Sequence, residues 1–120
     1  MDLIQTFLTV QTNIRLYHWS TPLYNQHIVS GQLYEKMDSL IDKFIETYLG
    51  KYPIVFQKSK LKIDQFDNEE TFHVMLTQFK HFLQSDVDLL LKSKHNNDLK
   101  NIRDDIIGEV NRFMFLLKLK

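Results

Sequence analysis

Residues 33–48 read LYEKMDSLIDKFIETY. The apolar members of this stretch recur every three or four positions, which is the spacing of the buried face of an amphipathic helix; they are Leu33, Met37, Leu40, Ile41, Phe44, Ile45 and Tyr48. Before the stretch, Ser20 and Thr21 are candidate helix caps and Pro22 suits a first turn, and Gly50 after it suits a helix end. The pattern predicts a helix over residues 22–49, about 40 Å long.

Three further segments have the same helical spacing. Residues 2–19 predict a helix with a buried stripe of Leu3, Phe7, Val10, Ile14 and Tyr17. Asp67 and Glu70 resemble a capping box that opens a helix ending near Ser93. Asn96 or Asn97 can cap a last helix that runs to Leu117. Residues 51–66 contain Pro53 and have no clean helical period, which predicts a crossover with room for one short helical turn.

Four helices joined in this way favour an all-α fold, a four-helix ferritin-like bundle with a longer crossover between the second and third helices. The alternative is another up-and-down bundle. The chain has 120 residues, which is enough for one core, so a single ferritin-like domain over residues 1–120 is expected.

Composition excludes several classes of function. The chain has no cysteine, so a disulfide framework and a cysteine-bound metal are both impossible. The formal net charge is zero, and this does not support DNA binding. No apolar run approaches the roughly 20 residues that cross a bilayer, and the N-terminus lacks the features of a secretory signal. We therefore expect a cytoplasmic protein without a membrane partner.

The helix over residues 22–49 carries one polar stripe. Its members fall within an arc of about 100° on a helical wheel: His27, Gly31, Glu35, Asp38, Asp42 and Glu46. Asp42 and Glu46 have the i, i+4 spacing that lets two carboxylates bind one cation. Taken alone, such acids are more often solvated surface residues, and a plain surface-acid helix of a monomer is one alternative.

His27 lies fifteen residues before Asp42, about 22 Å along a helix, so the two cannot bind one metal within a chain. They can do so if this helix packs antiparallel against its copy in a homodimer, around a two-fold axis near Tyr34 and Glu35. Gly31 has no Cβ and would permit close approach of helices near that axis. This geometry predicts two equivalent sites per dimer.

His18 ends the first predicted helix, close to the start of the second, and can join His27. Two imidazoles and two carboxylates form a mixed nitrogen and oxygen site that suits iron, with zinc as a substitute. His73, His81, Asp104, Asp105 and Glu109 lack the E-x-x-H pairs of di-iron bundles, and we expect them at the surface.

Tyr17-His18-Trp19, His27 and the run Asp42-Lys-Phe-Ile-Glu46 together resemble the ferroxidase motif of the Dps-like miniferritins. The resemblance implies that His18, His27, Asp42 and Glu46 are catalytic iron ligands, and that Trp19 shields radicals nearby. The segment between His18 and His27 is shorter than the family's usual spacing. Where many members carry a further acid, this chain has Gly31, and Glu35 or Asp38 would take its place as an outer ligand. The basic DNA-binding tail of some relatives is absent.

The resulting functional hypothesis is a Dps-like ferroxidase that oxidises Fe(II) with peroxide or oxygen between two subunits, for iron detoxification or storage and protection from oxidative stress. The alternative is a non-catalytic ferritin-like module that uses the same dimer interface for assembly. The absence of alanine and the abundance of Lys, Asn, Ile and Phe are typical of an AT-rich genome, including those of large DNA viruses. A viral module of this kind would be a component of the virion.

Overall fold

The computed structural model describes residues 2–93 and 95–120; Met1 and Lys94 lie outside the described residues. Within them the chain is helical and contains no strand, which confirms the all-α prediction. The elements in chain order are α1 (Leu3–Ser20), α2 (Tyr24–Leu49), α3 (Glu69–Gln84), α4 (Asp86–Leu90) and α5 (Asn97–Lys118). None of these helices, in the part of the chain that is described, combines the length and apolar character needed to cross a membrane.

The first two helices form a hairpin. Asp2 caps α1, where its Oδ1 accepts a hydrogen bond from the backbone N–H of Gln5 at 3.0 Å. The start of α2 differs from the prediction: Thr21 (φ −69°, ψ 133°) caps the end of α1, and Leu23 precedes α2. Pro22 disfavours helical backbone at the residue before it. The helix begins at Tyr24, and no side chain caps it.

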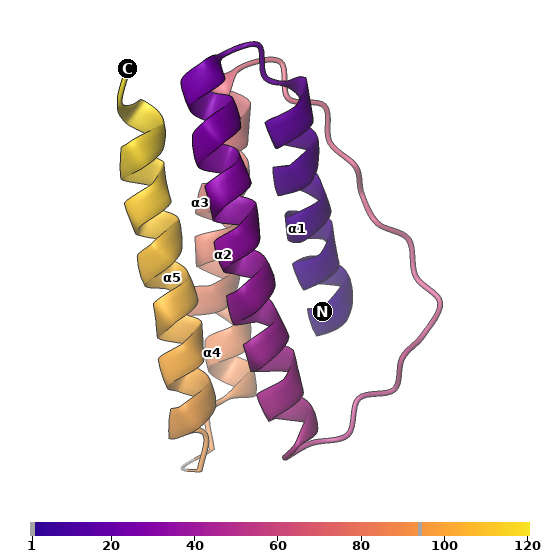
Figure 1. Cartoon of the computed structure of the whole chain (residues 1–120). Coiled ribbons are helices and arrows are strands. Elements are labelled where there is room, and N and C mark those ends of the chain that lie inside the picture. The colour runs from indigo at the N-terminus through magenta and orange to yellow at the C-terminus, as the bar shows by residue number, and fades with distance from the viewer. Residues whose placement is uncertain (1, 94) are drawn as a thin grey trace.

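The connection between α2 and α3 contains no helical turn over residues 53–66 and runs back along the bundle (Figure 1). As a result α2 and α3 run in one direction, and α1 and α5 run in the other. The buried Asn13 of α1 holds this crossover: its Nδ2 donates to the Lys62 carbonyl at 3.0 Å, and its Oδ1 accepts from the Asp64 N–H at 3.0 Å. About two turns nearer the start of α1, the side chain of Gln5 donates to the Lys60 carbonyl.

The third predicted helix is divided. Asn68, not Asp67, is the cap of α3 and accepts a hydrogen bond from the Thr71 N–H at 3.0 Å. The helix stops at Gln84 and a short α4 follows, because Ser85 adopts φ −110°, ψ −71°. Arg103 of α5 fills the break, donating to the Leu83 carbonyl at 3.3 Å. The expectation of one helix up to Ser93 was therefore wrong.

The last helix begins after Asn96, one of the two caps that we predicted. Its side chain does not cap the helix, however. Asn96 Oδ1 accepts a hydrogen bond from the Tyr52 hydroxyl at 2.6 Å, which joins the start of α5 to the beginning of the crossover.

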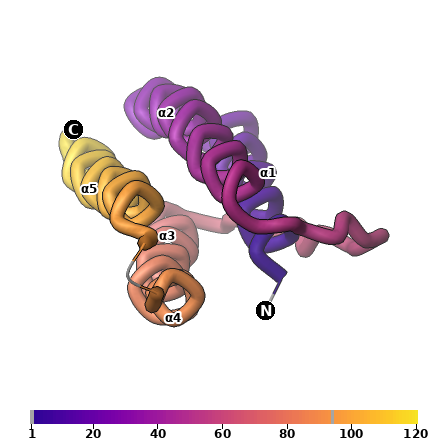
Figure 2. Tube along the Cα trace, turned by 90° about the horizontal axis from the view of Figure 1, so that it is seen from below, coloured from indigo at the N-terminus to yellow at the C-terminus, as the bar shows by residue number. Residues whose placement is uncertain are grey.

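The core lies between the four long helices. α2 packs against α1 on one side and α5 on the other, and α3 packs against α5 and α1 (Figure 2). Phe7 stands at the centre, with the rings of Phe44, Phe79 and Phe82 at 5.5, 6.0 and 5.9 Å between centroids. Because these four rings come from α1, α2 and α3, aromatic contacts join both hairpins of the bundle.

Candidate metal centre

His18 at the end of α1 and His27 at the start of α2 lie against each other. Their rings are stacked, with 4.0 Å between centroids and an angle of 12° between planes. The turn at residues 21–23 returns the chain so that the two side chains meet. The structure therefore brings together the two imidazoles that the sequence placed on one side of the chain.

Reciprocal hydrogen bonds orient the two rings. His18 Nδ1 lies 2.6 Å from the carbonyl oxygen of His27, and His27 Nδ1 lies 2.7 Å from the carbonyl oxygen of His18. A carbonyl oxygen only accepts, so each Nδ1 carries the proton. In the neutral rings each Nε2 then keeps its lone pair, and this is the arrangement that histidine metal ligands use.

Gly31 makes room for His18. A Cβ at Gly31 would lie 2.8 Å from His18 Cε1 and 3.0 Å from His18 Nδ1, too close for either atom. Nearby, the hydroxyl of the buried Ser30 donates to the His27 carbonyl at 3.2 Å. We expected this glycine to allow two helices to approach near a dimer axis. Within one chain, its lack of a Cβ already leaves space for the imidazole of His18.

The four acids of the stripe lie further along α2. Glu35, Asp38, Asp42 and Glu46 are all exposed. Asp38 Oδ1 accepts a hydrogen bond from Gln11 Nε2 of α1 at 3.3 Å. Among residues 2–93 and 95–120, no three His, Asp or Glu side chains lie close enough to hold one metal ion. A single chain therefore brings His18 and His27 together but does not bring them to the acids.

A groove lies beside Asp38 and Asp42, between α1, α2 and the crossover. It has a volume of about 220 Å³. Its walls are mainly apolar and include Ile4, Phe7, Leu8, Ile41, Ile45 and Phe56. The acidic end of the stripe is thus next to an apolar hollow, which nothing in the sequence pattern indicated.

Arg15 forms a second feature that sequence reasoning missed. Its guanidinium carbon lies 4.1 Å from the ring centroid of Tyr34 and 5.5 Å from that of Trp19. Both distances are within the range of a cation–π contact. The only available signal was the i, i+4 spacing of Arg15 and Trp19 on α1.

Four of the other candidates lie at the surface, as expected: His73, His81, Asp104 and Asp105; the fifth, Glu109, is half-buried. His73 and His81 are exposed on α3. Asp104 pairs with Arg103 at 2.7 Å, and Glu109 pairs with Arg112 at 3.4 Å. Both acids are therefore occupied by neighbouring cations of their own helix.

The fold and these contacts define an all-α protein whose first two helices meet at a stacked histidine pair. The chain belongs to DUF5856, a family of unknown function, whose model matches residues 18–117. This range begins at His18 and includes every candidate ligand. No curated protein and no solved structure matches the chain significantly.

Proposed function

We propose that this chain is a Dps-like iron-binding ferroxidase whose site forms between two subunits. His18 and His27 supply two imidazole nitrogens, and Asp42 and Glu46 of the partner subunit supply two carboxylates. The observation that carries the proposal is the histidine pair itself. Its two Nδ1 atoms are committed to backbone carbonyls, so its two Nε2 atoms are available to a metal.

The connectivity of the helices supports a ferritin-like bundle. A crossover that spans the bundle, with the helices before and after it running in the same direction, is the pattern of ferritin-like folds with one long connection (Figure 1). In that fold class, metal sites are built from carboxylates and histidines on helix faces.

The donor set suits iron as the substrate. Neutral imidazoles bind Fe(II), and anionic carboxylates favour the more highly charged Fe(III) product. With hydrogen peroxide as oxidant, two Fe(II) ions give up one electron each, and the peroxide takes up two protons and leaves as two water molecules. Asp42 would bind more than one iron ion. Glu35 or Asp38 would act as an outer ligand that orients the side chains binding the iron directly. Zinc would bind the same donors without electron transfer.

A second candidate, a non-catalytic assembly module, is favoured by the same hydrogen bonds. Each histidine side chain is tied to the other's backbone, which fastens α1 to α2 without any metal. In this case the histidine pair would stabilise the hairpin, and the polar stripe would serve only the contact between subunits.

Anaerobic titration of the metal-free protein with Fe(II), followed by peroxide or air and optical detection of Fe(III), separates the two. A ferroxidase should bind about one or two irons per chain and oxidise them faster than a protein-free control. The double variant His18→Ala/His27→Ala should lose both properties, whereas His73→Ala/His81→Ala, which changes two exposed histidines, should keep them. Absence of saturable binding in the unmodified protein would leave the assembly module.

A further inference from the structure

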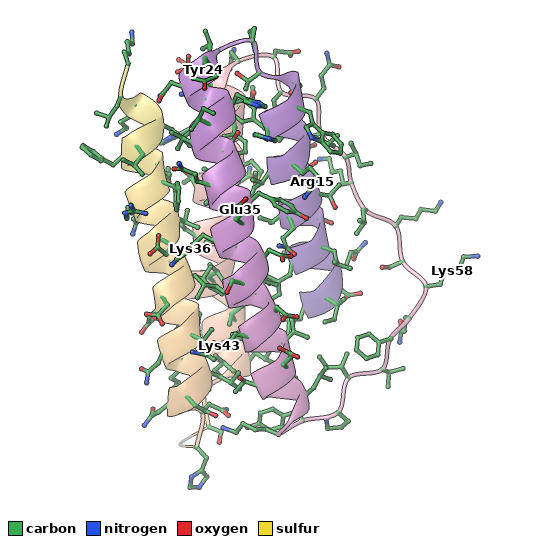
Figure 3. The ribbon with its side chains drawn as sticks, viewed as in Figure 1. Arg15, Tyr24, Glu35, Lys36, Lys43 and Lys58 are labelled. Carbon is green, nitrogen blue, oxygen red and sulfur yellow. The ribbon has the colours of Figure 1, made fainter. Side chains whose placement is uncertain are left out.

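The face formed by α1 and α2 is divided into two contrasting halves. The half near the α1–α2 turn carries Arg15, His18 and His27 and has no acid among residues 12–34. The other half carries the four exposed acids of α2. Figure 3 shows Arg15 and Glu35 at neighbouring heights on this face, while Lys36 and Lys43 lie toward α5. A surface of this kind is complementary to a second copy of itself placed antiparallel.

The apolar side chains of this face are divided in the same way. Trp19 is 64% exposed near the turn. The apolar groove lies at the opposite end, where Leu8 is 48% exposed and Phe56 is 66% exposed. Ile4, Leu8, Arg15 and Trp19 follow one stripe of α1, so the aromatic side chain and the groove open onto the same face.

The contacts between α1 and α2 give the register. Arg15 stacks on Tyr34, and Gln11 binds Asp38. The two helices are antiparallel, so the residue four positions earlier on α1 lies beside the residue four positions later on α2. Trp19, four residues after Arg15, is therefore level with Ser30, four residues before Tyr34. A two-fold axis between Tyr34 and Glu35 places Ser30 of one copy opposite Ser39 of the partner subunit, so Trp19 also lies at the level of that Ser39. Along α2, the groove extends from Asp38 to Ile45, so Trp19 reaches one end of it.

We propose that this groove receives Trp19 of a second copy of the chain, in a symmetric antiparallel dimer. Two such contacts form per dimer, and each one brings a histidine pair toward the carboxylates beside the groove. Near the axis the two Glu35 side chains would repel each other, and the guanidinium of Arg15 from the opposite copy supplies the countercharge. Among the described residues, Arg15 and Glu35 take part in no ion pair within their own chain.

This inference rests on the proposed function only in using the same two-fold axis, and it can be tested without iron. Trp19 is the only tryptophan of the chain, so its fluorescence reports its surroundings directly. Dilution series should show its emission moving to shorter wavelength as the dimer forms in sedimentation velocity. Leu8→Asp should raise the dimer dissociation constant about tenfold or more, while Phe115→Asp, at a 61% exposed site on α5, should leave it unchanged.

Disulfide trapping identifies the contact itself, because the chain has no cysteine. A mixture of the single variants Trp19→Cys and Leu8→Cys should form a mixed disulfide-linked dimer under mild oxidation. A mixture of Phe115→Cys and Leu8→Cys should not. Equal cross-linking of the two mixtures, or a dimer in which the Trp19 emission does not change, would overturn the proposal.

The two proposals fail separately. Iron oxidation that depends on His18 and His27, without docking of Trp19, would preserve the ferroxidase and overturn the groove contact. Docking of Trp19 without iron binding would preserve the groove contact and overturn the ferroxidase.

Discussion

The two ends of the polar stripe on α2 differ in how completely one chain builds them. At the histidine end, two rings, two carbonyls, a serine and a glycine fit together with specific contacts. At the acidic end, Asp42 is an exposed side chain beside an apolar groove, and Glu46 is exposed one turn further along α2. The difference indicates that folding of one chain fixes the positions of the histidines, whereas the positions of the acids depend on a partner that packs against them.

Both ends should be needed for metal binding, and the largest expected difference between them is in stability. His18→Ala/His27→Ala should abolish iron binding and also cost about 1–3 kcal/mol of unfolding free energy, since two hydrogen bonds are lost. Asp42→Asn/Glu46→Gln should abolish iron binding as well, yet change stability by no more than about 0.5 kcal/mol. Calorimetric metal titration and urea denaturation measure the two properties. Equal loss of stability in both variants would contradict the contrast.

Gly31→Ala should damage the histidine end alone. Its new Cβ would overlap the imidazole of His18, so we expect a loss of about 1–3 kcal/mol in urea denaturation. Gly108 of α5 is the matched control, because no atom lies within 4 Å of a Cβ built there. Gly108→Ala should stabilise the protein by about 0.5–1 kcal/mol. A Gly31→Ala variant with unchanged stability and unchanged iron binding would show that the space Gly31 leaves for His18 is not needed.

Mixing the two metal-binding variants tests whether the ends come from different chains. In a heterodimer of His18→Ala/His27→Ala with Asp42→Asn/Glu46→Gln, one of the two sites recovers all four ligands. Random pairing of equal amounts should therefore restore about one quarter of the wild-type iron sites. Activity of the mixture no greater than that of the separate variants would place the histidines and the acids in different sites.

The smallest effect concerns Tyr17, which lies next to the histidine pair. Its hydroxyl donates to Gln26 Oε1 at 2.8 Å, and burial raises the pKa of this hydroxyl above its ordinary value. A raised pKa in the folded state means that its contribution to stability is present below about pH 10 and is lost as the pH rises through the folded pKa. Tyr17→Phe should cost about 1 kcal/mol at pH 7 and should reduce the alkaline loss seen in urea denaturation between pH 9 and about pH 11. Burial also raises the pKa of Tyr48, which supplies part of the remaining dependence.

Much of the fold followed from apolar spacing, and the exceptions have local causes. The spacing of α1 and α5 gave their bounds within a few residues, because each has one uninterrupted buried stripe. The break after Gln84 was missed because Val87 and Leu91 continue the stripe, while Arg103, which fills the break, lies on another helix. Spacing alone cannot report a contact made from so far along the chain.

The candidate site was predictable to the same degree. Sequence order was enough to place His18 near His27 across a short turn. It could not show that each ring binds the other's carbonyl, or that Gly31 faces an imidazole, because both depend on how deeply α1 and α2 approach. The groove beside Asp42 depends on Phe56 of the crossover, a segment with no periodic pattern to read.

The crossover joins two helical hairpins, α1 with α2 and α3 with α5, which pack against each other most extensively where α2 lies along α5. Lys58 stands at its outermost point (Figure 3), whereas Asn13 holds the segment near Lys62 against α1. A protease that cuts after Lys58 would therefore leave one fragment with α1 and α2 and another with α3 to α5, each already folded back on itself. The chain could be expressed as these two pieces and reassembled, so that each hairpin becomes a separately labelled half of the same bundle.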